Sequence, residues 1–333
     1  MDVRGAVVVV TGASSGIGLA TAHAFSRAGA RLVLAGRREE PLEAAAEACR
    51  ALGAEALAVP TDVTDPVAVR LLLDAGIEAF GGVDVWVNNA GTSLWGRLEA
   101  MPPETHRALI DLDLTAAVYG AQAVLPHFRA RGAGVMINVV SFAGLVPVGY
   151  SATYSAAKFG LRGLTEALRH ELADQPGIQV CGVYPGFVDT PTYPRSVNYS
   201  GHELRPMPPV SDPGAVAAAI LGLARRPRRM ATVGPVPSLR LLYRVAPGPV
   251  GRRTARLVRR HLDAQPPAPP TDGALLETMP HGRTERDGWQ APKPAAAGGE
   301  LLWKGLLGAG LLGAAALGLG VGRRTVAMEQ DGR

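Results

Sequence analysis

The stretch Thr11-Gly-Ala-Ser-Ser-Gly-Ile-Gly18 constrains the fold more than any other part of the chain. It follows the apolar run Ala6 to Val10 and precedes Leu19 to Phe25, so a strand, a glycine turn and a helix are expected in this order. Glycines allow the backbone to approach a diphosphate closely, and the N-terminus of the next helix offers free N–H groups and a positive dipole end. The motif predicts a dinucleotide site, although turns use glycine for other reasons as well.

The length of 333 residues allows one large α/β domain or two smaller ones, and we favour one domain with appendages at its C-terminal end. The apolar N-terminal segment runs into the glycine turn without a cleavage pattern, so it predicts a core strand and not a signal peptide. Cys49 and Cys181 lie in apolar patterns, which predicts buried, reduced thiols and fits a cytoplasmic location.

The residues after the second predicted strand, Arg31 to Ala35, bear on the choice of cofactor. That strand ends in Gly36-Arg37-Arg38. An acidic residue at this place would accept a hydrogen bond from a ribose 2′-OH, whereas two arginines suit a 2′-phosphate. We therefore predict NADP (NADPH) in preference to NAD, with a solvated surface pair of arginines as the alternative.

Later strands are predicted at 54–59, 83–87, 134–140, 178–183 and 230–233. Small or polar residues follow several of them, at the sheet edge where ligands of open α/β sheets bind. Asp62 and Val63 follow one strand, and Asn88-Asn-Ala-Gly91 follows another, where a plain turn is the alternative. The segment Thr192 to Pro209 carries four prolines and is expected to form a mobile lid.

Tyr154-Ser-Ala-Ala-Lys158 begins a long predicted helix that reaches Leu172. Side chains at i and i+4 share one face of a helix, so the hydroxyl and the ammonium can point into one site. Taken alone, the pair is also compatible with an ordinary helix surface.

Together with Ser141 and Pro185-Gly186, these motifs resemble the short-chain dehydrogenase/reductase family, over about residues 5–235. The resemblance implies a Rossmann-type, doubly wound parallel sheet of about seven strands that binds a nicotinamide cofactor at its carboxyl-terminal edge. It also implies homodimers or homotetramers. The residues then expected to bind the cofactor are Gly12, Ser14, Ser15, Gly16, Ile17, Gly18, Arg37, Arg38, Asp62, Val63, Asn89, Ala90, Gly91, Tyr154, Lys158, Pro185, Gly186, Val188 and Thr190.

The resemblance also assigns catalytic roles. Tyr154 would be the acid/base, Lys158 would favour its ionisation and hold the nicotinamide ribose, and Ser141 would bond the substrate oxygen. Thr190 would meet the carboxamide. Where the family usually has asparagine before Leu-Thr, this chain has Asp113, a carboxylate expected to attract Lys158 directly, to weaken its effect on the tyrosine and to reduce activity.

The C-terminal third indicates a membrane. Eleven arginines and no acid occur from Arg225 to Arg260, and residues 236–264 predict a basic amphipathic helix that could lie on anionic lipid. A helix whose apolar face packs on the domain while its charged face is solvated is the alternative. Nucleic acid is disfavoured because no aromatic residues are interleaved with the arginines.

Residues 265–299 are rich in Pro, Ala and Gly, and a flexible linker is expected. Within 300–324, the run Gly305 to Val321 has no charge, so this segment is predicted to associate with or span a membrane, or to fold back on the enzyme. Residues 325–333 are a polar tail.

The predicted function is therefore an NADP-dependent oxidoreductase that interconverts a hydrophobic alcohol and a ketone or aldehyde in the cytoplasm, attached to a membrane. Apolar residues expected around the substrate are Leu94, Trp95, Leu145, Val146 and Phe187. We expect no metal site. The alternatives are a non-catalytic NADP-binding scaffold or sensor, and an epimerase or dehydratase on the same fold.

Overall fold

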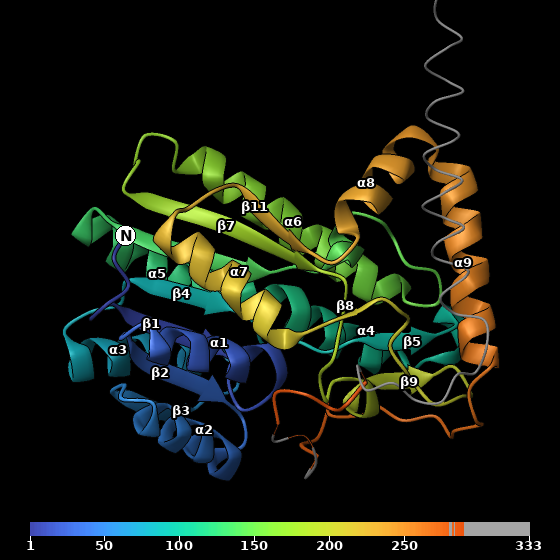
Figure 1. Ribbon diagram of the computed structural model, residues 1–333, viewed down its shortest axis with the longest axis horizontal. Helices are drawn as coiled ribbons and strands as arrows, with labels where there is room; N and C mark the ends of the chain where they lie inside the picture. Colours follow the sequence, from blue (N-terminus) through green and yellow to red (C-terminus); the bar gives the residue numbers. More distant parts are fainter. Residues whose placement is uncertain (280–281, 283, 290–333) are drawn as a thin grey trace, which may run out of the picture. The chain divides into compact units, whose positions relative to one another are not determined.

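The computed structural model describes residues 1–279, 282 and 284–289. Its centre is a seven-stranded parallel sheet of order β11-β7-β6-β4-β1-β2-β3 (Figure 1), which confirms the predicted fold class. The order reverses between β1 and β4, and ligands of such sheets bind beside this point, at the carboxyl ends of the strands. The strands are β1 (Val7–Thr11), β2 (Arg31–Gly36), β3 (Ala56–Pro60), β4 (Val85–Asn88), β6 (Gly134–Val139), β7 (Ile178–Pro185) and β11 (Met230–Val233).

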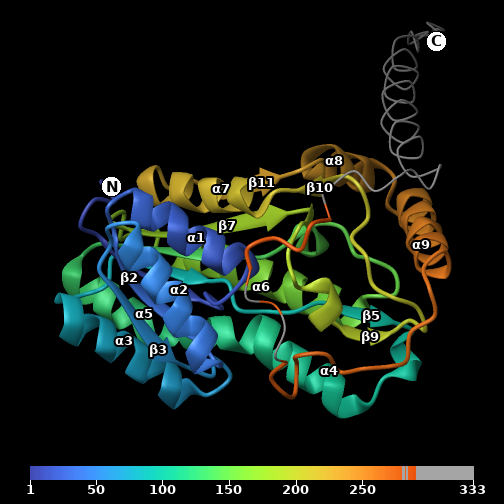
Figure 2. The ribbon, with the colours of Figure 1, turned by 60° about the horizontal axis from the view of Figure 1, so that its bottom comes forward.

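Helices cover both faces of the sheet, as the nearly continuous apolar strands require. One layer contains α1 (Gly16–Arg27), α2 (Glu39–Ala51) and α7 (Pro213–Arg225), and the other contains α3 (Pro66–Phe80), α5 (Ala116–Arg131) and α6 (Ala152–Glu171) (Figure 2). Each layer buries its own apolar cluster against the strands. The two layers hold the sheet rigidly, so the loops at its carboxyl-terminal edge are built on fixed supports.

Helix α4 (Pro103–Ile110) continues through a π-helical turn (Asp111–Thr115) into α5. Among the described residues, this continuous stretch of 103–131 is the one helix long and apolar enough to cross a membrane. Half of its apolar window is buried, and Val124 and Phe128 pack in the core. It is a core helix of the sheet layer.

Short elements cross the carboxyl-terminal edge. β5 (Leu94–Gly96) pairs with β9 (Val197–Tyr199), and β8 (Phe187–Val188) pairs with β10 (Val210–Ser211). The 3₁₀ turns are η1 (Leu98–Ala100), η3 (Phe142–Gly144) and η4 (Tyr193–Arg195). The predicted lid thus contains regular structure: η4 and β9 lie within it.

Residues 236–264 form α8 (Val236–Val245) and α9 (Pro247–Asp263). Val258 and Leu262 of α9 are buried among Trp95, Val148 and Met207, while the arginines of α9 are exposed. The amphipathic helix is therefore present, and it takes the alternative arrangement, with its apolar face on the domain.

The described part of the predicted flexible linker is packed against the domain. It runs along the carboxyl-terminal edge of the sheet, as the orange segment after α9 (Figure 2), and it bonds to the domain: Asn198 N–H donates to Thr271 O at 2.8 Å, and Ala274 N–H donates to Arg195 O at 2.9 Å. Because isolated bridges and side-chain contacts hold the segment, and no continuous helix or strand does, its sequence shows no helical or strand periodicity. The predicted hydrophobic segment 300–324 and the tail 325–333 lie outside the described residues.

Candidate active site

The glycine turn packs so tightly that two of its positions admit no side chain. A Cβ on Gly12, whose φ is +67°, would lie 2.9 Å from Ala90 Cα, and a Cβ on Gly18 would lie 2.1 Å from Gly12 O. Asn89 fastens the two loops together, because its Nδ2 donates to Thr11 O at 2.8 Å. The turn therefore presents bare backbone to the space above it, as an anion site requires.

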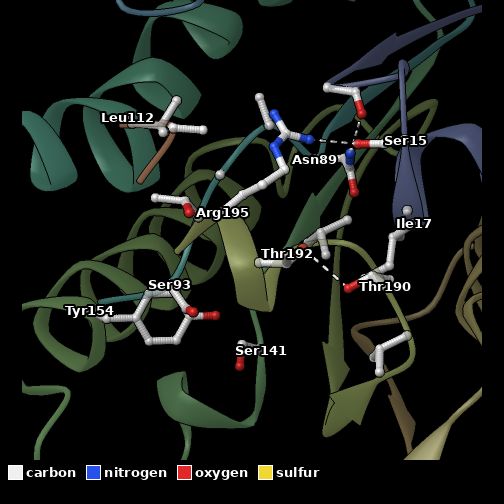
Figure 3. A pocket seen from close by; sticks show the side chains of 18 of the residues that line it. Ser15, Ile17, Asn89, Ser93, Leu112, Ser141, Tyr154, Thr190, Thr192 and Arg195 are labelled. Atoms are coloured by element: carbon white, nitrogen blue, oxygen red, sulfur yellow. Dashed lines mark hydrogen bonds between the residues drawn. The ribbon is translucent and has the colours of Figure 1, made fainter. Parts of the chain in front are cut away.

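A cavity opens above this turn, at the carboxyl-terminal edge of the sheet (Figure 3). All the predicted cofactor-binding residues line it except Gly18, which lies beneath against Gly12 and Asn89. The sequence motifs thus converge on one space although they come from different strands.

The candidate acid/base lies at one side of that cavity. Tyr154 and Ser141 point into the same space (Figure 3). Lys158 Nζ lies 5.5 Å from the centre of the Tyr154 ring. Ser141, two residues after the end of β6, has a φ of +103°, a strained conformation for a residue with a side chain. Its Oγ accepts the Ala143 N–H at 3.2 Å.

Asp113 comes from the π-helical turn, a type of distortion that recurs at functional sites. Its Oδ2 lies 3.1 Å from Lys158 Nζ, and its Oδ1 accepts the Thr92 N–H at 2.9 Å. The aspartate thus attracts the lysine directly, as expected from the residue type, and it lies just behind the cavity rather than in its lining.

The electrostatic balance at Tyr154 differs from the expected one. Burial raises the pKa of Tyr154; the charge of Lys158 opposes this, the charge of Asp113 adds to it, and the net direction is upward. Burial lowers the pKa of Lys158, but Asp113 and Tyr154 outweigh it, so this pKa is raised and the ammonium is retained. Burial also raises the pKa of Asp113, against the effect of Lys158.

Arg195 is a cavity residue that the motifs did not predict. Its Nη1 donates to Ser15 Oγ at 3.2 Å, and its buried Nε has no hydrogen-bond partner among the described residues (Figure 3). Burial lowers the pKa of Arg195 to about 10, and the charges of Arg38 and Arg37 contribute. Three guanidinium groups therefore gather at one end of the cavity. In the sequence, Arg195 is one of two arginines in the proline-rich segment, and nothing in the sequence distinguishes it from Arg205.

The opposite end of the cavity is apolar. Trp95 and Phe187 stack with ring centres 6.5 Å apart, and Phe142 lies 5.4 Å from Phe187. Trp95 and Phe187 line the cavity, as predicted. The other three residues predicted around the substrate do not line it and belong to neighbouring buried clusters: Leu94, Leu145 and Val146. Apolar residues near a site and apolar core residues have the same sequence pattern, which explains the error.

This fold and site define a class of dinucleotide-dependent enzyme. The chain belongs to the short-chain dehydrogenase family, whose model matches residues 6–198. It is an oxidoreductase acting on CH–OH groups.

Three known proteins illustrate the similarity. The chain is 33% identical over 292 residues to the uncharacterized oxidoreductase YxnA of Bacillus subtilis, covering 85% of this chain and 82% of that one. It is 38% identical over 234 residues to 3beta-hydroxysteroid dehydrogenase 1 of Eggerthella lenta, covering 67% and 88%. The structure of L-sorbose reductase from Gluconobacter frateurii, complexed with NADPH and L-sorbose, superposes with a TM-score of 0.63 at 29% identity, covering 70% and 97%.

Proposed function

We propose that this protein is an NADP-dependent oxidoreductase that interconverts a hydrophobic alcohol and its ketone or aldehyde. The observation that carries the proposal is one cavity that joins the bare glycine turn, the Tyr154–Lys158 pair and an aromatic wall. Each part serves one requirement of the reaction: holding a dinucleotide, moving a proton and accommodating an apolar substrate.

The residues present fit a nicotinamide dinucleotide. The turn would hold the diphosphate, and Asn89, Ala90, Gly91 and the segment 185–190 would border the nicotinamide ribose and ring. When bound, the nicotinamide supplies a hydride to a carbonyl carbon, or accepts one from an alcohol.

The protein's own contribution is proton transfer and orientation. Ser141 would donate a hydrogen bond to the substrate oxygen and so stabilise its developing charge. The Tyr154 hydroxyl would give its proton to that oxygen in reduction, and the phenolate would take it back in oxidation. Lys158 would stabilise the phenolate, and Asp113 would position Lys158 at the base of the site.

The preference for NADP over NAD rests on Arg37, Arg38 and Arg195. Guanidinium groups form strong, often paired hydrogen bonds to phosphate, and Gly36 at the end of β2 provides no carboxylate for a ribose 2′-OH. The lowered pKa of Arg195 supports the proposal, because burial and the neighbouring charges of Arg38 and Arg37 disfavour its cation, which a bound anion would stabilise.

The substrate class follows from the aromatic wall and from α9. Leu257, Val258 and Leu262 of α9 share an apolar cluster with Trp95 and Tyr154, so the outer end of the pocket is closed by apolar side chains. Such a wall favours a bulky apolar alcohol over a sugar. The similarity to a hydroxysteroid dehydrogenase agrees with this choice.

The decisive experiment follows NADPH absorbance while the purified chain is mixed with a panel of apolar ketones and aldehydes. Oxidation of NADPH by the wild type, with loss of turnover but retention of binding in Tyr154→Phe, supports the proposal. Binding without oxidation across the panel would favour a scaffold or sensor. Substrate loss without net cofactor consumption would favour an epimerase or dehydratase.

We also propose that the enzyme is cytoplasmic and attached to a membrane. The exposed arginines of α9, together with Leu241 and Val245 of α8, whose exposed fractions are 64% and 66%, form a surface suited to anionic lipid. Co-sedimentation with phosphatidylserine vesicles tests this, using the full chain and a chain ending at Gly299. Equal pelleting of both would exclude the C-terminal tail as the anchor, and no pelleting of either would exclude attachment.

A further inference from the structure

The segment after α9 lies over the phosphate end of the cavity. We call its described residues, 271–279, 282 and 284–289, the strap. Ala274 and Thr278 line the cavity together with the glycine turn. Neither residue belongs to the part of the chain that the family model matches, which ends at residue 198.

Carbonyl groups of the strap take the arginine donors proposed for the 2′-phosphate. Arg37 donates to Leu275 O at 3.0 Å and also to Ala274 O. Arg38 donates to Met279 O and to Gly282 O, each at 2.8 Å. The strap therefore places oxygen acceptors where the oxygens of a phosphate are expected.

The strap also reaches the diphosphate position. Gly16 N–H, at the N-terminus of α1, donates to Thr284 O at 2.9 Å. This N–H belongs to the free end of the helix, which is the group that the glycine turn exposes for an anion. The donors expected for the 2′-phosphate and those expected for the diphosphate are thus both already bonded to carbonyl groups of the strap.

Both ends of the strap are anchored away from these donors. Asp272 accepts hydrogen bonds from Thr105 Oγ1 at 2.8 Å and from the Tyr199 hydroxyl at 3.1 Å. At the other end, Asp189 accepts from the Trp289 N–H at 2.9 Å, and Arg286 pairs with Asp212 at 2.6 Å. Its middle can therefore leave the cavity while its ends stay attached.

We propose that the strap is an internal competitor for the cofactor, whose carbonyls hold the phosphate-binding donors of Gly16, Arg37 and Arg38 until a dinucleotide displaces them. A phosphate oxygen is charged and a carbonyl is not, so the exchange favours the cofactor at each arginine. The cofactor binds only to molecules in which the strap is open. The apparent affinity for the cofactor is therefore the intrinsic affinity multiplied by the open fraction. The inference rests on the proposed use of NADP(H).

Two glycines of the strap provide a matched pair of variants. Gly282 and Gly288 both have a φ of +81°, so alanine is equally strained at both positions. At Gly282 a Cβ would lie 2.8 Å from Arg195 Cδ, whereas at Gly288 nothing lies within 4 Å. Gly282→Ala therefore crowds the contact between the strap and Arg195 and should weaken the closed position of the strap, and Gly288→Ala controls for backbone strain.

The first experiment measures NADPH affinity by fluorescence titration, without substrate. A chain ending at Pro270 lacks the strap, and a chain ending at Trp289 keeps it. We expect the shorter chain to bind NADPH at least several-fold more tightly, and Gly282→Ala to bind more tightly than Gly288→Ala. The chain ending at Pro270 is compared only if its thermal melt matches that of the full chain, and Gly282→Ala in the full chain carries the test otherwise. Equal or weaker binding by the folded short chain, or by Gly282→Ala relative to Gly288→Ala, would overturn the inference. Failure of every chain to bind NADPH or NADH would instead overturn the proposed cofactor, and the inference with it.

The second experiment measures hydrogen exchange of the full chain with and without NADPH. A displaced strap exposes its amides, so peptides from 271–289 should exchange faster when NADPH is bound, while the glycine turn becomes protected. Slower exchange in the strap would show that it closes over the bound cofactor, and would overturn the competition.

Discussion

Lys158 Nζ lies 3.1 Å from Asp113 Oδ2, and their side chains are 7% and 0% exposed. The ammonium that should stabilise the Tyr154 phenolate is thereby paired with a second anion. Members of the short-chain dehydrogenase family usually have a neutral asparagine at this position, so this chain departs from the family pattern by forming the ion pair. Asp113 is therefore a positioning residue, and the effect of its charge can be measured through the titration of Tyr154.

Asp113→Asn is expected to shift the pH dependence of alcohol oxidation. Oxidation needs the phenolate of Tyr154, and the charge of Asp113 raises the pKa of that tyrosine. Removing this charge lowers the pKa, so the rise of kcat/KM with pH should move to lower pH. Because the pKa of Tyr154 is raised, the profiles must extend above the ordinary pKa of a phenol, which is about 10, to measure the shift. An unchanged profile, or one moved to higher pH, would contradict the role.

Tyr154→Phe should reduce kcat by roughly 10²- to 10⁴-fold, the usual contribution of a positioned acid/base. NADPH affinity should stay within a few-fold of the wild type, because the ring is kept. Tyr119→Phe, in α5 and packed against the core of that layer, is a matched control and should keep its activity. Comparable losses in both variants would mean a general defect instead of lost proton transfer.

Arg195→Ala should weaken NADPH binding by about 10- to 100-fold, the range for one hydrogen bond to a charged group. Arg37→Ala with Arg38→Ala should abolish the preference for NADPH over NADH. Arg107→Ala, on the exposed side of α4, is the control for total charge. Titration of each variant with NADPH and with NADH measures these affinities. A preference for NADPH that is retained in the double variant would refute the role of Arg37 and Arg38 in binding the 2′-phosphate.

Leu262→Ala should widen the apolar end of the pocket. Leu262 and Val258 enclose a small void with Trp95, Phe187 and Met207, so truncation extends this space. The ratio of kcat/KM for a larger ketone to that for a smaller one should rise several-fold. Leu241→Ala, on the exposed side of α8, is the control. Truncating a buried leucine to alanine costs about 2–5 kcal/mol of folding free energy, so a thermal melt must first confirm that the variant folds. An unchanged ratio in the folded variant would show that α9 does not border the substrate pocket.

The sheet and the motif residues were predictable because their signals are local. The predicted strand 230–233 coincides with β11, and the glycine turn, Asn89 and Tyr154 border one cavity because parallel strands end at one edge. Arg195 and the strap were not predictable, because their partners lie far away in sequence. The net direction of the Tyr154 pKa was missed because it depends on burial, which no spacing reveals.

The hydrogen bond from Gly16 to Thr284 joins the beginning of the described chain to its end. During synthesis on a ribosome, the sheet and its glycine turn emerge well before residue 284, and N-terminal parts generally fold first. We therefore expect the nascent enzyme to offer an open groove to cellular dinucleotides. The order of events in the chain's own production would let a newly made molecule load its cofactor without competition.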